Sequence, residues 1–252
     1  MGLLGALVLT YNEEENIIDC LESINWIDEL VVVDSYSEDE TVELAKQHTE
    51  KVYQREFDDF SSQRNFGLDQ IESEWVLVVD ADERVTFELK EEVLERLNNP
   101  QAEGYRIPRK NYFLGKWIKY CGWYPDYTLR LFKVADNRYS GLVHEGIKID
   151  GRVDKLDNAF IHYTYRNLKH YLDKINQYTT LDAEDKYQAG KKKGLAYILL
   201  RPVVEFIKKY FLKKGFLLGF QGLILSILSS YYQFLKYIKL WEKHEVDSRG
   251  DE

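Results

Sequence analysis

The chain has 252 residues, enough for one large α/β domain or for a domain with an appended segment. Hydrophobic residues make up 44% of it and charged residues 31%, as in an ordinary globular protein. A net charge of −9 argues against nucleic acid as a partner, because binding to a phosphate backbone needs a basic face. Cys20 and Cys121 are too few for a disulfide framework or a zinc site. No basic segment precedes the first apolar run, so we expect no signal peptide and a cytoplasmic protein.

The first hundred residues alternate short apolar runs with segments of helical pattern. Strands are predicted at residues 3–10, 30–33, 52–53 and 75–79. Helices are predicted after Asn12, after Ser37, and over residues 61–70 and 86–98. Because each strand is apolar along its length, we expect an α/β fold in which helices cover both faces of a doubly wound, mostly parallel sheet.

Two of these helices carry a capping pattern at their start. Asn12 is placed as an N-cap, and Glu15, three residues later, completes a capping box. Ser37 and Glu40 repeat the pattern before the next helix. The sequence therefore predicts that each of these side chains closes the first turn of its own helix.

Beyond residue 100 the pattern changes. Residues 104–165 are rich in aromatic side chains and partly alternating, which is typical of antiparallel strands added to the sheet. Residues 166–244 follow a helical pattern. We expect interruptions of these helices at Pro202, Gly215, Gly219 and Gly222.

Asp80-Ala81-Asp82 directly follows the apolar strand at 75–79. Side chains two apart in an extended segment point the same way, so we expect the two carboxylates to converge. Mg²⁺ and Mn²⁺ take such oxygen ligands and fill their remaining positions with substrate phosphates and water. Ligands bind open parallel sheets at the carboxyl ends of the strands, where this pair lies. The pattern predicts a metal–diphosphate site, and its alternative is an ordinary solvated turn.

Polar residues follow other elements at the same expected edge. Thr10-Tyr11-Asn12-Glu13 follows the first strand, Asp34-Ser35 follows the second, and Arg64-Asn65 opens a later helix. A ring can stack on a nucleobase, a carboxylate can accept from a base N–H or a ribose hydroxyl, and an arginine can pair with phosphate. Singly, each has a structural explanation as a cap, a turn residue or a surface salt bridge. Together they predict a nucleotide-diphosphate site.

The C-terminal region is basic, since only Glu205 and Glu242 oppose the many lysines and arginines of residues 186–243. Residues 215–235 carry no charge and are long enough to span a bilayer, but their glycines and polar residues weaken that interpretation. A stripe at helical spacing comprises Ile224, Ile227, Tyr231, Phe234, Ile238 and Trp241. Such a helix packs on its own domain or on a second subunit, or it lies in the plane of an anionic membrane.

Six motifs combine into a recognisable set: Thr10-Tyr11-Asn12-Glu13, Val33-Asp34-Ser35, Gln63-Arg64-Asn65-Phe66-Gly67, Val79-Asp80-Ala81-Asp82-Glu83, Leu129-Arg130-Leu131-Phe132 and Gly141-Leu142-Val143-His144-Glu145. With this set the chain resembles family 2 glycosyltransferases of the GT-A fold. It is similar to the bacterial branch that adds sugars to the lipopolysaccharide inner core, including β-glucosyltransferases. The resemblance covers residues 3–165 well and the C-terminal part more loosely.

The resemblance implies roles for particular residues. The nucleotide-sugar site would comprise Thr10, Tyr11, Glu13, Asp34, Arg64, Asp80 and Ala81. The nucleoside would most often be uridine, and Arg64 would approach the diphosphate. Asp82, together with Asp80 and a late histidine, His162, would hold the Mg²⁺ or Mn²⁺ that neutralises the leaving diphosphate.

Inverting transfer needs one base on the acceptor hydroxyl and one electrophile at the diphosphate. The family's usual Glu-Asp motif is missing here, and His144-Glu145 occupies its place. Glu145 is the candidate base and Asp126 the alternative. Nearby aromatic residues either stack on acceptor sugars or belong to the core. We expect acceptor contacts from Trp117, Trp123, Tyr124 and Arg130.

The hypothesis is a metal-dependent, inverting glycosyltransferase that moves a hexose, glucose from a UDP-sugar, to a membrane-linked glycan at the cytoplasmic face of the membrane. Residues 1–165 would form the catalytic domain, with a nucleotide-sugar half at 1–100 and an acceptor half at 101–165, and residues 166–252 a helical extension. One alternative is a polyprenyl-phosphate glycosyltransferase. Others are a nucleotidyltransferase that makes the nucleotide sugar and a non-enzymatic nucleotide-binding protein.

Overall fold

The computed structural model describes residues 4–135, 137–140, 146–165 and 167–250. The chain divides into two compact units. The first unit comprises Met1–Lys110 and Asp126–Tyr163, and the second comprises Asn111–Pro125 and Thr164–Glu252. Residues 111–125 therefore group with the helical region, although the sequence analysis assigned them to the acceptor half of the first domain.

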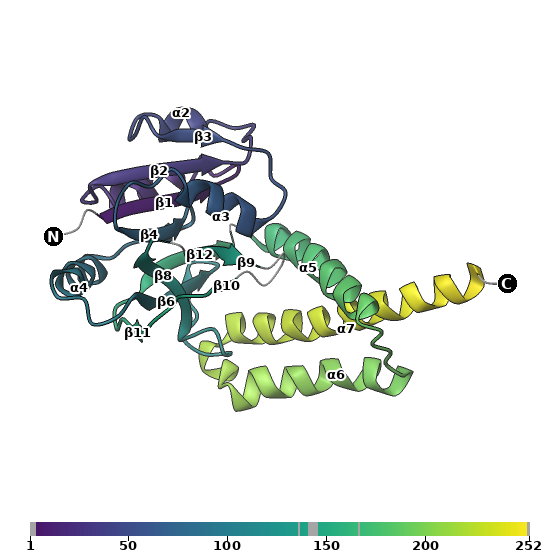
Figure 1. Ribbon diagram of the computed structural model, residues 1–252. Helices are drawn as coiled ribbons and strands as arrows, with labels where there is room; N and C mark the ends of the chain where they lie inside the picture. Colours follow the sequence, from purple (N-terminus) through teal and green to yellow (C-terminus); the bar gives the residue numbers. More distant parts are fainter. Residues whose placement is uncertain (1–3, 136, 141–145, 166, 251–252) are drawn as a thin grey trace. The chain divides into compact units, whose positions relative to one another are not determined.

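A sheet in strand order β3-β2-β1-β4-β8-β6-β12-β5 runs through the described part of the chain (Figure 1). Its four parallel strands are β1 (Leu4–Thr10), β2 (Glu29–Asp34), β3 (Val52–Gln54) and β4 (Trp75–Asp80). The strands joined to them are β5 (Glu83–Arg84), β6 (Gly104–Phe113), β8 (Asp126–Lys133) and β12 (Phe160–Tyr165), with β7 (Lys116–Trp117) and β11 (Val153–Lys155) paired to β6. A separate pair consists of β9 (Tyr139–Ser140) and β10 (Gly146–Ile147). All four predicted parallel strands are confirmed.

The predicted antiparallel addition is also present, with one difference. Strand β8 pairs antiparallel with both β4 and β6, and β12 pairs antiparallel with β5. Strand β11, however, runs parallel to β6. The pairing of 104–165 is thus mixed, which a local alternating pattern does not specify.

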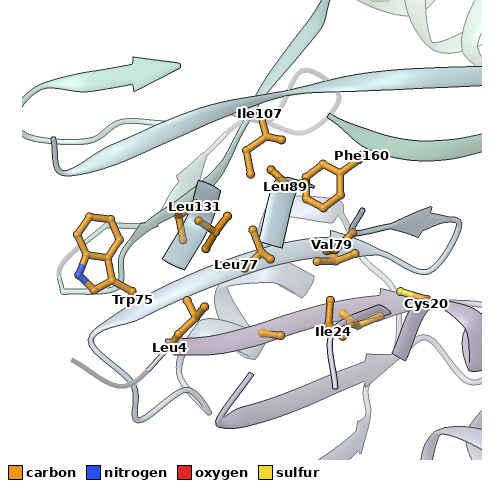
Figure 2. Packing of buried hydrophobic residues seen from close by; sticks show 14 of the residues in the cluster. Leu4, Cys20, Ile24, Trp75, Leu77, Val79, Leu89, Ile107, Leu131 and Phe160 are labelled. Carbon is orange, nitrogen blue, oxygen red and sulfur yellow. The ribbon is translucent and has the colours of Figure 1, made fainter. Parts of the chain in front are cut away.

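Helices cover both faces of the parallel strands because successive side chains of a strand point to opposite faces. Four helices follow the strands: α1 (Ile17–Ser23), α2 (Thr41–Ala45), α3 (Phe60–Leu68) and α4 (Phe87–Asn98). Even-numbered positions of β1 pack in one apolar cluster with residues of α1, α2 and α4. Leu7 packs in a second cluster with Leu68 from α3. Figure 2 shows the first cluster, in which Leu77 and Val79 of β4 lie among Ile24 and Leu89.

The register brings the carboxyl ends of three strands to one edge. Thr10 of β1 is paired with Asp34 of β2, and its neighbour Leu9 is paired with Asp80 of β4. Residues that follow β1, β2 and β4 therefore start from adjacent points. This edge is where the sequence predicts the nucleotide site.

The two predicted capping boxes are wrong. Helix α1 begins at Ile17, and Asn12, with φ of 52°, instead accepts from the backbone N–H of Glu38 at 2.8 Å. The Ser37 hydroxyl accepts from the Asn12 backbone N–H at 2.8 Å and donates to Asp34. These side chains join the loops after β1 and β2, because hydrogen bonds between the two loops replace local caps.

The second unit contains three long helices: α5 (Leu168–Gln188), α6 (Leu195–Ile207) and α7 (Phe220–Gly250). A turn of π-helix, η1 (Lys208–Leu212), and a 3-10 turn, η2 (Gly215–Leu218), connect α6 to α7. Pro202 and Gly222 lie inside helices, so the interruptions predicted at these residues are wrong. Tertiary contacts outweigh their low helix propensity: the Ser230 hydroxyl, for example, donates to the Pro202 carbonyl at 2.7 Å.

Helix α7 packs against both α5 and α6 (Figure 1). Within its predicted apolar stripe, Ile224 contacts one buried cluster and Phe234 and Ile238 contact another. Ile227 and Trp241 are exposed. Part of the stripe therefore serves intramolecular packing. None of the helices in the described part of the chain is long and apolar enough to cross a bilayer.

Candidate functional site

Asp80, the last residue of β4, is held by two arginines. Arg64 of α3 donates from Nη2 to Asp80 Oδ1 at 3.0 Å, and Arg130 of β8 donates to both carboxylate oxygens. Arg64 and Arg130 have little exposed surface, and Asp80 is 28% exposed. Burial on its own raises the pKa of Asp80, but the charges of Arg130 and Arg64 outweigh it and hold that pKa well below its usual value.

Glu83 extends the same network and is fully buried. Its Oε1 accepts from Arg130 Nη2 at 3.2 Å and lies 3.5 Å from Arg109 Nη1. Its Oε2 accepts from the backbone N–H of Asp80 at 3.0 Å, which fixes the end of β4. Buried charges need such partners, because an unpaired one carries a large desolvation penalty.

Arg109 and Asp126 are direct neighbours across the β6–β8 ladder. Arg109 donates from Nε and Nη2 to Asp126 Oδ2 at 3.0 and 2.6 Å. Three arginines thus balance three carboxylates from the end of β4 to the start of β8. Neither Glu83 nor Arg109 was predicted to be a site residue. The position of Glu83 directly after the acidic turn could have identified it from the sequence, whereas the role of Arg109 follows only from the register of β6 against β8.

Asp82 lies beside His162. The backbone turns at Ala81 and Asp82, so the alternation of an extended strand, on which the expected convergence of the Asp80 and Asp82 carboxylates rests, does not apply there. Asp82 Oδ2 is 3.4 Å from His162 Nε2 of β12. The Tyr163 backbone N–H donates to the Asp82 carbonyl at 2.9 Å and holds the turn against β12. Two predicted metal ligands are therefore adjacent, and the third, Asp80, is bound by arginines.

The donor set fits a divalent cation only in part. Within the described residues, no group of three or more histidine, cysteine, aspartate or glutamate side chains is arranged to hold a metal ion. Asp82 and His162 supply one carboxylate and one imidazole. Mg²⁺ and Mn²⁺ are commonly held by one or two protein side chains together with substrate phosphates, so this pair fits a cation that arrives with a diphosphate.

Asp34 lies at the end of β2 and has no exposed surface. Its carboxylate accepts from the Ser37 backbone N–H at 2.8 Å and from Gln54 Nε2 at 3.3 Å. Beside it, Thr10 is buried and its carbonyl accepts from the Ser35 backbone N–H. A fully buried aspartate fixed in this way presents a rigid acceptor at the strand end.

The loop after β1 carries the other predicted nucleoside residues. The Tyr11 ring is 54% exposed, which leaves it available for stacking. Glu13 accepts from Asn16 Nδ2 at 2.7 Å, and its backbone N–H donates to the Thr41 hydroxyl at 2.8 Å. Ala81, in the turn after β4, is buried. The structure thus brings Thr10, Asp34 and Asp80 to one edge of the sheet, with Tyr11 and Ala81 directly after two of these strands.

The residues predicted to contact the acceptor are divided between the two units. Arg130 is bound to Asp80 and Glu83, and its side chain is 5% exposed. Trp117, Trp123 and Tyr124 belong to the second unit. Trp123 packs edge-on against Phe113, and Trp117 packs against Tyr124 at a ring separation of 5.4 Å. Glu145, the candidate base, lies outside the described residues, as does His144.

The match to a family model decides the family. The model described as "Glycosyl transferase family 2" matches residues 6–147, more than half of the chain. The chain belongs to glycosyl transferase family 2. It is a glycosyltransferase, and the strand ends, arginines and carboxylates described above lie within the matched segment, with the exception of His162.

Full-length relatives agree with this assignment. The chain is 28% identical over 260 residues to the lipopolysaccharide core biosynthesis glycosyltransferase LpsC of Rhizobium meliloti, covering 98% of this chain and 94% of LpsC. An uncharacterized glycosyltransferase of Rickettsia typhi is 27% identical over 96% of this chain and 88% of its own length. The similarity extends through the C-terminal helices, beyond the segment matched by the family model.

Comparison with solved structures supports the fold. The mannosyltransferase PcManGT of Pyrobaculum calidifontis, solved with GDP-mannose and Mn²⁺, matches with a TM-score of 0.54 at 15% identity and covers 95% of this chain and 87% of its own. The expected α/β GT-A fold with a C-terminal helical region is confirmed. Family membership also decides against a nucleotidyltransferase and against a non-enzymatic nucleotide-binding protein.

Proposed function

We propose that this glycosyltransferase transfers a hexose, glucose from UDP-glucose, with inversion to a membrane-linked glycan such as lipopolysaccharide core or another cell-surface polysaccharide. The observation that carries the proposal is the Asp82–His162 pair in the turn that follows the arginine-bound Asp80, at an edge where β1, β2 and β4 end together. The near-complete similarity to LpsC, named as a lipopolysaccharide core enzyme, supports the acceptor class.

The donor nucleoside is assigned to the ends of β1 and β2. Asp34 has no exposed surface, so its part in this proposal is to fix the end of β2 beneath the nucleoside, and the exposed Tyr11 ring is suited to stack on the base. Thr10, Glu13 and Ala81 would belong to the same edge.

The diphosphate is assigned to Arg64 and to the Asp82–His162 pair. Mg²⁺ or Mn²⁺, held by Asp82 and His162, would neutralise charge on the leaving diphosphate. Asp80 and Arg130 serve a different purpose in this proposal. Arg130 fixes Asp80, and Asp80 in turn orients the Arg64 guanidinium, which makes Arg130 a positioning residue.

The base is assigned to Glu145. The acceptor hydroxyl attacks the anomeric carbon as its proton passes to a carboxylate, and the bond from that carbon to the diphosphate oxygen breaks, which inverts the configuration. Asp126, the alternative, is bound to Arg109 at 2.6 Å, so its carboxylate already belongs to an ion pair. This pairing favours Glu145 by comparison.

A transfer assay tests the proposal. UDP-glucose, UDP-galactose and GDP-mannose are each incubated with truncated lipopolysaccharide and Mn²⁺, and both nucleoside diphosphate release and the mass of the product are recorded. We expect a product one hexose heavier from UDP-glucose. Glu145→Gln should lower turnover by roughly 10²–10⁴-fold with unchanged donor affinity. A loss of turnover in Asp126→Asn alone would move the base to Asp126, and transfer only to a polyprenyl phosphate would overturn the acceptor class.

A further inference from the structure

Helix α6 and the turns after it expose a continuous series of large apolar side chains. On α6 they are Leu195, Leu199, Leu200, Val203, Val204 and Ile207, and beyond it they are Phe211, Leu212, Phe216, Leu217 and Phe220. The α6 members recur at three- and four-residue spacing, so they lie on one side of the helix. We refer to these eleven residues as the α6 face. Leu200 is 63% exposed and Leu212 is 73% exposed, and together the eleven residues form an extended apolar patch and not single exposed side chains.

The opposite side of α6 carries polar side chains, of which Glu205 is buried. Glu205 is 5% exposed and is bound by Arg201 Nη2 at 3.1 Å, and the hydroxyl of Tyr197, a residue that is 39% exposed, lies 3.3 Å from that of Tyr237 on α7. Ile198 is the buried apolar exception. A helix packed on a protein in water normally buries its apolar stripe and exposes its polar one. In α6 this arrangement is reversed, which indicates that the outer side meets an apolar medium.

Lysines flank the α6 face at both ends. Lys191, Lys192 and Lys193 precede α6, and Lys208, Lys213 and Lys214 lie in the turns after it, all of them exposed. Such a charge arrangement complements an anionic surface. It opposes burial of the face against a second copy of the chain, because that contact would bring two sets of lysines together.

We propose that the α6 face is a membrane-binding surface that lies in the plane of an anionic bilayer, with its apolar side chains at the boundary between headgroups and acyl chains. None of the described helices is both long enough and apolar enough to span a bilayer. Apolar burial supplies depth and the lysines supply attraction to acidic lipid. The inference rests on the proposed function in one respect: a membrane-linked acceptor gives the attachment its purpose.

The first experiment is flotation of the full chain with vesicles of phosphatidylethanolamine and phosphatidylglycerol, and with vesicles of phosphatidylcholine alone. We expect flotation with the anionic vesicles at low salt, weakening as salt rises. Leu200→Asp with Val204→Asp should abolish it. Phe87→Asp is the matched control, because Phe87 on α4 of the first unit is 72% exposed, and this variant should float like the native chain.

Charge is tested separately. Lys208→Gln, Lys213→Gln and Lys214→Gln together should weaken binding to the anionic vesicles by roughly 100-fold, at roughly fivefold for each lysine. Lys46→Gln, which removes an exposed lysine of the first unit, should have no such effect. Flotation that persists unchanged in the Leu200→Asp, Val204→Asp variant, or no flotation of the native chain, would overturn the proposal.

A probe of depth separates insertion from adsorption. Both native cysteines are buried, and burial raises the pKa of each thiol, so a cysteine introduced by Leu200→Cys is the reactive one for a polarity-sensitive fluorophore. We expect its emission to shift to the blue with anionic vesicles, and that of a Phe87→Cys label to stay unchanged. A blue shift that depends on protein concentration without lipid would instead assign the face to a second copy and overturn the proposal.

Binding and catalysis are measured independently. Donor binding by Leu200→Asp, Val204→Asp in vesicle-free buffer should equal that of the native chain. Vesicle binding without sugar transfer would support the α6 face as a membrane-binding surface and overturn the proposed function. Sugar transfer without vesicle binding would support the proposed function and overturn membrane binding by the α6 face.

Discussion

The two units of the chain differ in where they place charged and apolar side chains. In the first unit, Arg64, Arg109 and Arg130 form a balanced charge network with carboxylates at the end of β4, and apolar residues fill the clusters on both faces of the sheet. In the second unit, α6 turns charged residues inward and exposes its apolar side. The first arrangement suits a rigid polar site, and the second suits a surface that leaves water.

The largest effect is expected from the charge network of the first unit. Arg130→Leu leaves the fully buried Glu83 with one positive partner, the more distant Arg109, so the free energy of unfolding should fall by about 3–5 kcal/mol. Arg138→Leu is the control, because its pair with Asp69 is exposed and contributes about 0–1 kcal/mol. Urea unfolding of both variants checks this, and equal small losses would show that the network contributes little.

Adjacent residues of α6 offer a comparison within the second unit. Ile198 is 1% exposed and Leu199 is 55% exposed, although they are neighbours in sequence. Ile198→Ala should cost about 2–4 kcal/mol, since it leaves a cavity against α7. Leu199→Ala should stay within about 0.5 kcal/mol in lipid-free buffer. A large loss for Leu199→Ala in urea unfolding would mean that the α6 face is already covered by protein.

Acid provides a smaller and graded test of the first unit. Because the folded-state pKa of Asp80 is depressed, its ionised form stabilises the fold above the unfolded-state pKa, and this contribution is lost as pH falls through the folded-state value. Asp80→Asn should therefore be less stable than the native chain at neutral pH, with a difference that shrinks as the pH is lowered below about 4. A difference that is constant across a urea-midpoint series from pH 7 to pH 3 would contradict the assigned pairing.

Much of the first unit was predictable because its information is local. Continuous apolar runs identify buried parallel strands, and polar residues directly after them identify the site edge at Thr10, Asp34 and Asp80. What local patterns miss is long-range pairing. The Asn12 contact with Glu38 and the Arg109 contact with Asp126 depend on register between distant segments.

The second unit was harder to predict for a different reason. Apolar periodicity identifies a helix, but it does not show whether protein or another medium covers the apolar side. The stripe at 224–241 was therefore considered for membrane contact, although part of it is packed and the exposed apolar side is that of α6. Pro202 also made α6 hard to predict. Its low helix propensity predicts an interruption, whereas contacts with α7 keep the helix continuous through this residue. An exposed side can be recognised only once the packed side is known.

Calorimetric titration with UDP tests the central claim, a donor diphosphate bound through the Asp82–His162 pair, most directly. We expect the native chain to bind UDP in Mn²⁺ and to lose at least tenfold in affinity with a chelator. In Asp82→Asn the chelator should cause no further loss, because the substitution and the chelator each remove the same metal bridge to the diphosphate. Asp69→Asn, at an exposed pair, should behave like the native chain. Equal UDP affinity with Mn²⁺ and with chelator in the native chain would contradict the account.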